Sequence, residues 1–428
     1  MRRPITTAAA LVALLAGGEA LASPLPTYGF GSRETSLASA ATAVSEGPAA
    51  VFYNPAGLAH ATGLTLQAGY LHVRQRLQIG GRDTGVDPVK GLNLGLVAPG
   101  RIAGIPFAFG LAVHLPDERL SRVRTLRQEI PRWELYDNRA QILFLAVAAS
   151  VRPLPWLSLG GGVAFLSSTR GNFGITGEAN LREPTDSPLR HEVDADLTAV
   201  RIPLLGVRVE PHRRLSVGLT YRGESKLDLR IDADIRGQVD TGIGGLKIPV
   251  TYTLSSRSFD AFQPRQVALG TRFSATDALR LSLDFVWTNW SSYQSATSRT
   301  VTDLQIDTTL NLAIPPNPKP TVVRDPQFRD RLVPRLGAEW SPWVRPAAAV
   351  AVRAGYAYEL SPVPPQNALT NFVDGDRHTL ATGAGVKLRP DASWFTGEVA
   401  LDAHAALAIL PERETRKRSA ADFVGDYR

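Results

Sequence analysis

The chain has 428 residues, of which 44% are hydrophobic, and it carries no cysteine and a formal net charge of +7. Without cysteine, neither a disulfide framework nor a thiolate metal site is possible. The positive charge is spread along the chain and not clustered, which argues against a nucleic-acid partner. No linker or shift in composition indicates a boundary between soluble domains.

Residues 1–22 have the composition of a secretory signal peptide. Two arginines precede a short apolar run, and Ala20-Leu21-Ala22 supplies the small-x-small pattern that signal peptidase accepts. The run is shorter than the roughly 20 apolar residues that a membrane-spanning helix needs. A buried N-terminal helix is the alternative. On the signal-peptide interpretation, the mature chain begins near Ser23 and lies outside the cytoplasm.

Residues 50–73 change character halfway along. The first half is small-residue sequence broken by Asn54-Pro55-Ala56, and the second half alternates like a β-strand from Leu64 onward. Pro55 fixes its own φ and lacks an N–H donor, while Asn54 can hydrogen-bond its local backbone. The motif therefore predicts a defined turn directly before the first strand.

From residue 63 onward, apolar and polar residues alternate with a period of two, which is the pattern of β-strands. In LRLSLDFVW, residues 279–287, every second residue is large and apolar. No later stretch approaches 18 consecutive apolar residues, so transmembrane helices are not expected. We expect strands at 64–74, 90–99, 104–115, 139–151, 156–167, 195–210, 213–235, 248–273, 278–289, 331–341, 346–359, 378–389 and 394–410.

Two all-β architectures fit such alternation, a soluble sandwich and a bacterial outer-membrane barrel. Many residues opposite the apolar face are Gly or Ala, which suits a crowded lumen, and tryptophans collect near strand ends, as in membrane-interface girdles. The connections between the expected strands also alternate between short and long, which is the pattern of periplasmic turns and external loops. We therefore predict an all-β fold, a transmembrane antiparallel β-barrel.

The strand count raises a question about the end of the chain. Thirteen strands that start in the periplasm finish outside, whereas bacterial single-chain barrels have even strand numbers. Residues 411–428 are too charged to form a closing strand. We expect a fourteenth strand to be absent from this sequence; the alternative is one miscounted strand within residues 213–273.

Four motifs in order resemble the FadL family of outer-membrane transporters for long-chain fatty acids and other hydrophobic compounds. They are SAATAVSEGPAAVFYNPAGLA (39–59), LTYRGESKLDL (219–229), LDFVWTNWSSY (283–293) and the segment 352–388, with Ser-Pro-Val-Pro and Asp-x-Asp-Arg. The resemblance implies a 14-stranded barrel at 63–428, plugged by an N-terminal hatch at 23–62. It also implies that Asn54, Pro55 and Ala56 belong to the gate. The alternative for this motif is an ordinary turn.

The loop at 116–138 is a candidate external groove. Leu120, Val123, Leu126 and Ile130 recur at helical spacing, with arginines around them. Such a helix would offer an apolar face to an acyl chain and cations to its carboxylate. The alternative is a loop helix packed on its neighbours, with its arginines paired to lipopolysaccharide phosphates.

Several arginines lie in the inward-facing phase of the expected strands. An arginine is the natural partner of a fatty-acid carboxylate, through charge-assisted hydrogen bonds. Barrel lumens also contain charge networks that serve only for support, and the sequence does not distinguish the two roles. The candidates for ligand binding are Arg222, Arg272, Arg280 and Arg353.

Signals for catalysis are weak. The 7 histidines show no HExxH or other metal-ligand spacing, and no G-x-S-x-G nucleophile elbow occurs. We therefore expect no enzyme, no metal and no cofactor, but a monomeric bacterial outer-membrane channel for passive uptake of hydrophobic molecules, foremost long-chain fatty acids. Its other partners would be outer-membrane lipid and lipopolysaccharide. The alternatives are a porin-like or structural barrel without hydrophobic transport and an outer-membrane lipase.

Overall fold

The computed structural model describes residues 25–118, 130–137, 143–180, 189–240, 245–295, 299–306, 317, 319–320, 322–366, 370–390, 397–417, 419–420, 422 and 425–428. The expected signal peptide therefore lies outside the described residues. So do three of the loop candidates, Leu120, Val123 and Leu126. No helix within the described ranges is long and apolar enough to cross a membrane.

The described chain is almost entirely β-structure after residue 64. Its helices are α2 (Leu25–Tyr28), α3 (Ser32–Ser36), α4 (Ala50–Tyr53), the 3-10 helix η1 (Pro55–His60) and the 3-10 helix η2 (Trp290–Ser292). The strands are β1 (Thr65–Val73), β2 (Gln78–Ile79), β3 (Arg82–Asp83), β4 (Val89–Ile102), β5 (Ile105–Pro116), β6 (Phe144–Leu154), β7 (Leu157–Asn180), β8 (Leu189–His212), β9 (Leu215–Arg222), β10 (Ser225–Asp240), β11 (Lys247–Gln263), β12 (Gln266–Ser274), β13 (Leu279–Thr288), β14 (Arg299–Ile306), β15 (Arg331–Val344), β16 (Ala348–Glu359), β17 (Arg377–Leu388) and β18 (Val399–Ile409).

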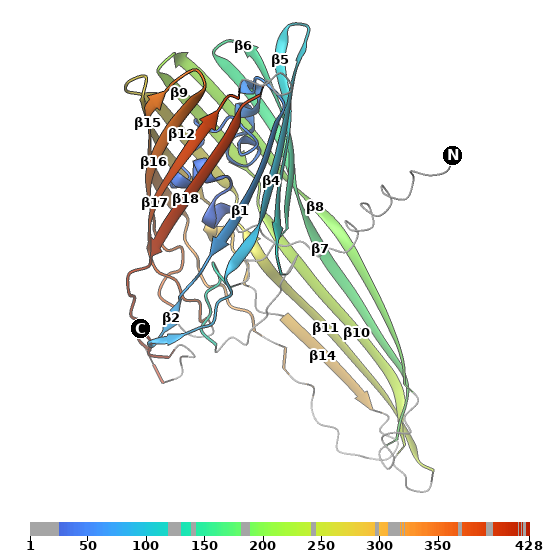
Figure 1. Ribbon diagram of the computed structural model, residues 1–428. Coiled ribbons are helices and arrows are strands. Elements are labelled where there is room, and N and C mark those ends of the chain that lie inside the picture. The colour runs from blue at the N-terminus through green and yellow to red at the C-terminus, as the bar shows by residue number, and fades with distance from the viewer. Residues whose placement is uncertain are drawn as a thin grey trace, which may run out of the picture.

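One antiparallel path forms the barrel wall. Its order is β1-β4-β5-β6-β7-β8-β9-β12-β13-β15-β16-β17-β18, and Figure 1 shows it curving around the N-terminal helices. The two ends of the path, β1 and β18, each pair with one neighbour among the described strands. The thirteen strands expected from the alternation correspond to the thirteen strands of this path.

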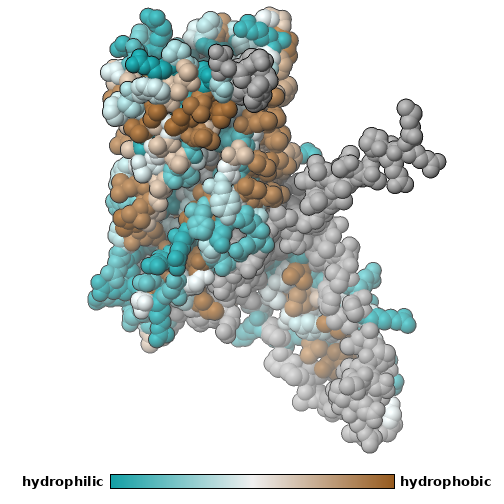
Figure 2. Space-filling model, in the orientation of Figure 1, coloured by the Kyte–Doolittle hydropathy of each residue, from teal (hydrophilic) through white to brown (hydrophobic). Residues whose placement is uncertain are grey.

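Outward-facing side chains of the wall are apolar, as a lipid-facing surface requires. Leu66 of β1 is 73% exposed and Leu401 of β18 is 67% exposed. Both are large apolar side chains on the outer face of the wall. Figure 2 shows apolar residues gathered over the outer surface of the wall. Short connections, such as the one between β8 and β9, lie at the upper end of Figure 1, which is therefore the periplasmic end.

The long expected strands at 213–235 and 248–273 are wrong as single elements. Each is divided in two, giving β9 and β10 on one side and β11 and β12 on the other. Gly223 passes close to Pro203, and its N–H donates to the Pro203 carbonyl at 3.0 Å; Pro264 lies between β11 and β12 and has no N–H for a ladder. The alternation of side chains survives these breaks, so it could not reveal them.

An arm of the same 16-stranded sheet projects beyond the external end of the barrel. β7 and β8 are 24 residues each, and the distal part of β7 pairs in parallel with β10. β10 pairs with β11, and β11 pairs with β14, a strand that the sequence analysis placed in a loop. Figure 1 shows this arm at the lower right, away from the N-terminal helices.

The N-terminal segment, residues 25–62, lies inside the curve of the wall (Figure 1). It contacts strands on opposite sides: η1 packs on β5, β6, β7 and β8, while α3 packs on β16, β17 and β18. Nine wall glycines make this possible, because a Cβ on any of them would lie 3.0 Å or less from an atom of the segment. They are Gly95, Gly110, Gly160, Gly206, Gly218, Gly270, Gly337, Gly355 and Gly383. We call them the glycine ring.

Candidate functional site

The turn at Asn54-Pro55-Ala56 is a buried, fully hydrogen-bonded element. Asn54 is 1% exposed, and its side-chain oxygen accepts a hydrogen bond from the Ala56 N–H at 3.1 Å, which caps η1 with Pro55 in its first turn. Its amide nitrogen donates to the Thr42 carbonyl at 2.8 Å and to the Val207 carbonyl of β8 at 3.1 Å. One side chain thus joins two parts of the N-terminal segment to the barrel wall.

The wall has glycines, Gly160 and Gly206, at the positions that lie closest to this turn. A Cβ on Gly206 would lie 2.1 Å from Asn54 Oδ1, and a Cβ on Gly160 would lie 2.3 Å from the Pro55 carbonyl carbon. The hydroxyl of Ser150 donates to the Ala56 carbonyl at 3.1 Å. The turn therefore packs directly against the backbone of the wall strands, and this contact fixes the position of the turn.

Replacing Gly206 with Ala is expected to destabilise the closed arrangement by about 1–3 kcal/mol, because a methyl group has no room beside Asn54 and Pro55. The measurement is the temperature at which the purified barrel loses its heat-modifiable mobility on a gel. Gly69→Ala in β1 is the matched control, since a Cβ there meets nothing within 4 Å. Equal midpoints for the two variants would contradict this close packing.

A small luminal cavity of about 30 Å³ lies where the N-terminal segment meets β9, β12, β13 and β15. Its lining residues are Ser39, Thr42, Phe52, Tyr53, Thr220, Arg222, Gln266, Ala268, Val286 and Arg335. That volume is enough for about one water-sized group and well below the several hundred Å³ of a typical ligand pocket. A larger ligand can therefore occupy this place only if the N-terminal segment moves.

Arg222 is the notable cation of this cavity. It is 9% exposed, and its guanidinium lies 4.1 Å from the centroid of the Phe52 ring. It donates to the Phe52 carbonyl and, at 3.3 Å, to Gln266 Oε1, while its Nε has no partner. No carboxylate among the described residues forms an ion pair with it. Buried cations are normally neutralised by an anion, so Arg222 has an unmet electrostatic requirement.

The other three predicted arginines lie in ion-pair clusters. Arg272 is 3.3 Å from both Glu46 and Glu210. Arg280 is 3.0 Å from Glu339, and Arg353 is 2.7 Å from Glu339 and 2.6 Å from Asp402. Arg222 thus lies next to the Asn54 turn. Unlike Arg272, Arg280 and Arg353, it forms no ion pair with a carboxylate among the described residues.

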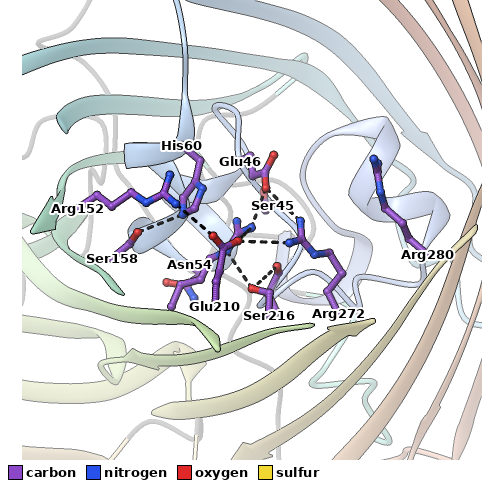
Figure 3. A network of polar contacts seen from close by, with 12 residues as sticks. Ser45, Glu46, Asn54, His60, Arg152, Ser158, Glu210, Ser216, Arg272 and Arg280 are labelled. Atoms are coloured by element: carbon purple, nitrogen blue, oxygen red, sulfur yellow. Dashed lines mark hydrogen bonds and ion pairs between the residues drawn. The ribbon is translucent and has the colours of Figure 1, made fainter. Parts of the chain in front are cut away.

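The first cluster joins the N-terminal segment to the wall near the periplasmic end (Figure 3). Arg208 is 2.7 Å from Glu46 of the segment and 2.7 Å from Glu210 of its own strand. Arg272 contacts the same two carboxylates. Burial alone would raise the pKa of Glu46, but the charge and hydrogen bond of Arg208, with the charges of Arg33 and Arg272, lower it to about 2. Glu46 is therefore an anion under ordinary conditions.

Two further contacts attach the segment to the wall. Arg33 of α3 is 2.9 Å from Glu339 of β15 and forms a two-pronged hydrogen bond with it. His60 at the end of η1 lies 3.1 Å from the Ser158 hydroxyl, and burial together with the nearby Arg208 charge lowers the pKa of His60 to about 4. His60 is therefore neutral at pH 7.

Glu46, Arg208 and Glu210 were not predicted from the sequence. Arg208 and Glu210 lie in the inward phase of β8, together with Leu204 and Gly206, so strand parity alone could have indicated them. Glu46 precedes the first strand, where no alternation exists, and its role depends on contacts 162 residues away in the chain.

External loops enclose a second, larger cavity of about 380 Å³. It lies between the β2–β3 hairpin, residues 364–366 and 372–375, and residues 410–415 and 427–428, and its apolar lining includes Leu77, Trp133 and Phe372. Trp133 belongs to the loop that the sequence analysis proposed as an external groove. Ile130 of that loop is 38% exposed and is not among the lining residues.

Comparisons with known proteins agree on one relationship. A sequence model of a protein family, described as outer membrane protein transport protein (OMPP1/FadL/TodX), matches residues 147–402. Alkane uptake protein A of Marinobacter nauticus is 25% identical over 427 residues, covering 94% of this chain and 86% of that protein. The crystal structure of a Pseudomonas aeruginosa FadL homologue superposes with a TM-score of 0.54 at 17% identity, covering 96% of this chain and 95% of the other.

Proposed function

Because the chain belongs to the OMPP1/FadL/TodX family of outer-membrane transport proteins, whose model matches more than half of it, we propose that it takes up long-chain fatty acids. It is a bacterial outer-membrane protein for hydrophobic compounds and not an enzyme. The N-terminal segment is the hatch of this transporter, and Asn54, Pro55 and Ala56 hold it against the wall.

The observation that carries the proposal is Arg222. It is a buried guanidinium in the lumen without a carboxylate partner among the described residues, and Phe52, Ala268 and Val286 lie around the same cavity. A fatty acid offers a carboxylate for the cation and an acyl chain for the apolar lining. The small volume of the cavity fits the head group alone, so the chain would enter space that opens when the hatch moves.

An alkane is the second candidate, because the curated relative is named an alkane uptake protein. An alkane would gain nothing from Arg222, and burying this guanidinium without an anion is costly. A carboxylate ligand accounts for both the charge and the apolar lining. Arg222 therefore favours fatty acids over hydrocarbons.

The proposed route begins at the external cavity and continues through the lumen to the hatch, with lateral exit into the membrane. Transfer of an acyl chain from water to lipid gains about 0.8 kcal/mol per CH₂, which is enough to drive uptake without an energy source. The luminal site must bind weakly enough to release its ligand. We further propose that the protein works as a monomer and that its external loops meet lipopolysaccharide.

Uptake by cells that lack or express the protein tests this function. Radiolabelled oleate is expected to enter expressing cells faster, and hexadecane is expected to enter both equally. Faster entry of hexadecane alone would replace the fatty-acid proposal with the alkane one. Equal entry of both compounds with and without the protein would leave the porin-like alternative.

A further inference from the structure

The N-terminal segment is held to the wall by ion pairs whose wall partners have a second counter-ion. Arg208 and Arg272 contact Glu46 of the segment, but both also contact Glu210 of β8. Glu339 contacts Arg33 of the segment, but also Arg280 and Arg353 of the wall. The same arrangement therefore occurs twice. In the first the segment supplies the anion, Glu46, and in the second it supplies the cation, Arg33.

In both ion pairs the side chain on the wall is more deeply buried than the side chain on the segment. The side chains of Arg208 and Glu339, on the wall, are 1% and 5% exposed, whereas those of Glu46 and Arg33, on the segment, are 42% and 24% exposed. If the segment withdraws, its charged groups gain water and the wall groups keep a counter-ion. Arg208 keeps its contact with Glu210, and Glu339 keeps Arg280 and Arg353, which lowers the usual cost of breaking a buried ion pair.

From this arrangement we infer that Glu46 and Arg33 are two detachable latches of the hatch, with Glu210 and Arg353 as the wall groups that replace them on opening. The inference deepens the proposed function, because it assigns the residues that control hatch movement. Asn54 has a different role. Its amide nitrogen joins the Thr42 carbonyl of the segment to the Val207 carbonyl of β8 without any ion pair, so it anchors the closed hatch.

The latches predict opposite effects for two substitutions that remove the same charge from the same cluster. Glu46→Gln weakens the latch, while Arg208 and Arg272 keep their contacts with Glu210, so the hatch opens more often. Glu210→Gln removes the replacement, so withdrawal of Glu46 would leave Arg208 buried without an anion, and the hatch opens less often. A carboxylate that serves only for support would give the same direction in both variants.

The absence of native cysteine allows hatch opening to be measured directly. A single cysteine in place of Ala43, which is 1% exposed, is labelled by an uncharged maleimide only when the segment leaves the wall. In this background, Glu46→Gln is expected to label about fivefold faster, and Glu210→Gln about fivefold slower, than the parent. Removal of a nearby negative charge changes thiol reactivity in the same direction in both variants, so it cannot produce opposite shifts.

Arg33→Gln provides an independent check at the second latch and is expected to accelerate labelling like Glu46→Gln. Heat-modifiable gel mobility shows that each variant is a folded barrel. Labelling that shifts in the same direction in Glu46→Gln and Glu210→Gln, or in neither, would overturn the latch assignment. Because labelling needs no ligand, a failed latch and a failed transport function are separate results: the expected labelling shifts without oleate uptake would refute only the function.

Discussion

Replacing Arg222 with Gln is expected to lower oleate uptake by about tenfold or more, because a charge-assisted hydrogen bond to a carboxylate contributes about 1.5–3 kcal/mol. The substitution removes the one of the two cavity-lining arginines, Arg222 and Arg335, that has no carboxylate partner among the described residues, but retains a hydrogen-bonding side chain near Gln266 and Phe52. The barrel should still assemble, since Arg222 forms no ion pair with the described wall residues. Uptake of labelled oleate, corrected for the amount of folded protein, gives the measurement.

Two companion variants make this test specific. Arg222→Lys keeps the charge and should recover part of the uptake. Arg280→Gln removes a luminal arginine whose side chain is 46% exposed and whose partner Glu339 keeps Arg33 and Arg353, so it should leave uptake close to the parent level. If Arg222→Gln and Arg280→Gln transport oleate equally well, Arg222 does not receive the carboxylate.

Replacing Asn54 with Ala should leave an assembled barrel that takes up oleate several-fold more slowly. The change removes the hydrogen bonds of Asn54 with the Ala56 N–H and with the Thr42 and Val207 carbonyls, and the buried Ala56 N–H alone costs about 1–3 kcal/mol if water does not replace Asn54. Phe52 and Tyr53, which line the luminal cavity, directly precede Asn54. Loss of the anchor therefore displaces the groups that shape the cavity.

The control for Asn54→Ala is Asn317→Ala. Asn317 also hydrogen-bonds a backbone N–H and a neighbouring side chain, those of Leu304 and Asp303, but it lies exposed on the arm side of the molecule. Its replacement should not change uptake or hatch labelling. Normal uptake by Asn54→Ala would reduce the motif to an ordinary turn before the first strand.

The barrel could be predicted from the sequence because its two faces have different solvents. Lipid outside and a packed lumen inside impose a period of two on every strand, and Leu279 to Trp287 in β13 shows it without interruption. The arm could not be predicted in this way. Residues 225–263 keep the same alternation as β9 and β12, and alternation specifies which face a side chain occupies but not which strand is its neighbour.

The candidate site could be predicted only in part from the sequence, for a related reason. The alternation of the strands places all four arginines in the lumen, and the sequence does not show which of them binds a ligand. The four are Arg222, Arg272, Arg280 and Arg353. What distinguishes Arg222 is the lack of a carboxylate nearby, which depends on where Glu46, Glu210, Glu339 and Asp402 come to lie. Local chemistry did suffice at Asn54, because its hydrogen bond to the Ala56 N–H spans two residues.

The glycine ring also constrains the order in which the molecule is assembled. Glycine in a strand loses more conformational entropy than other residues and contributes no side chain to packing, so at this level contacts with the segment supply the packing that the wall glycines lack. An empty barrel would lack those contacts. We therefore expect the segment to be enclosed while the sheet is still open, with the wall folding around it during insertion into the membrane.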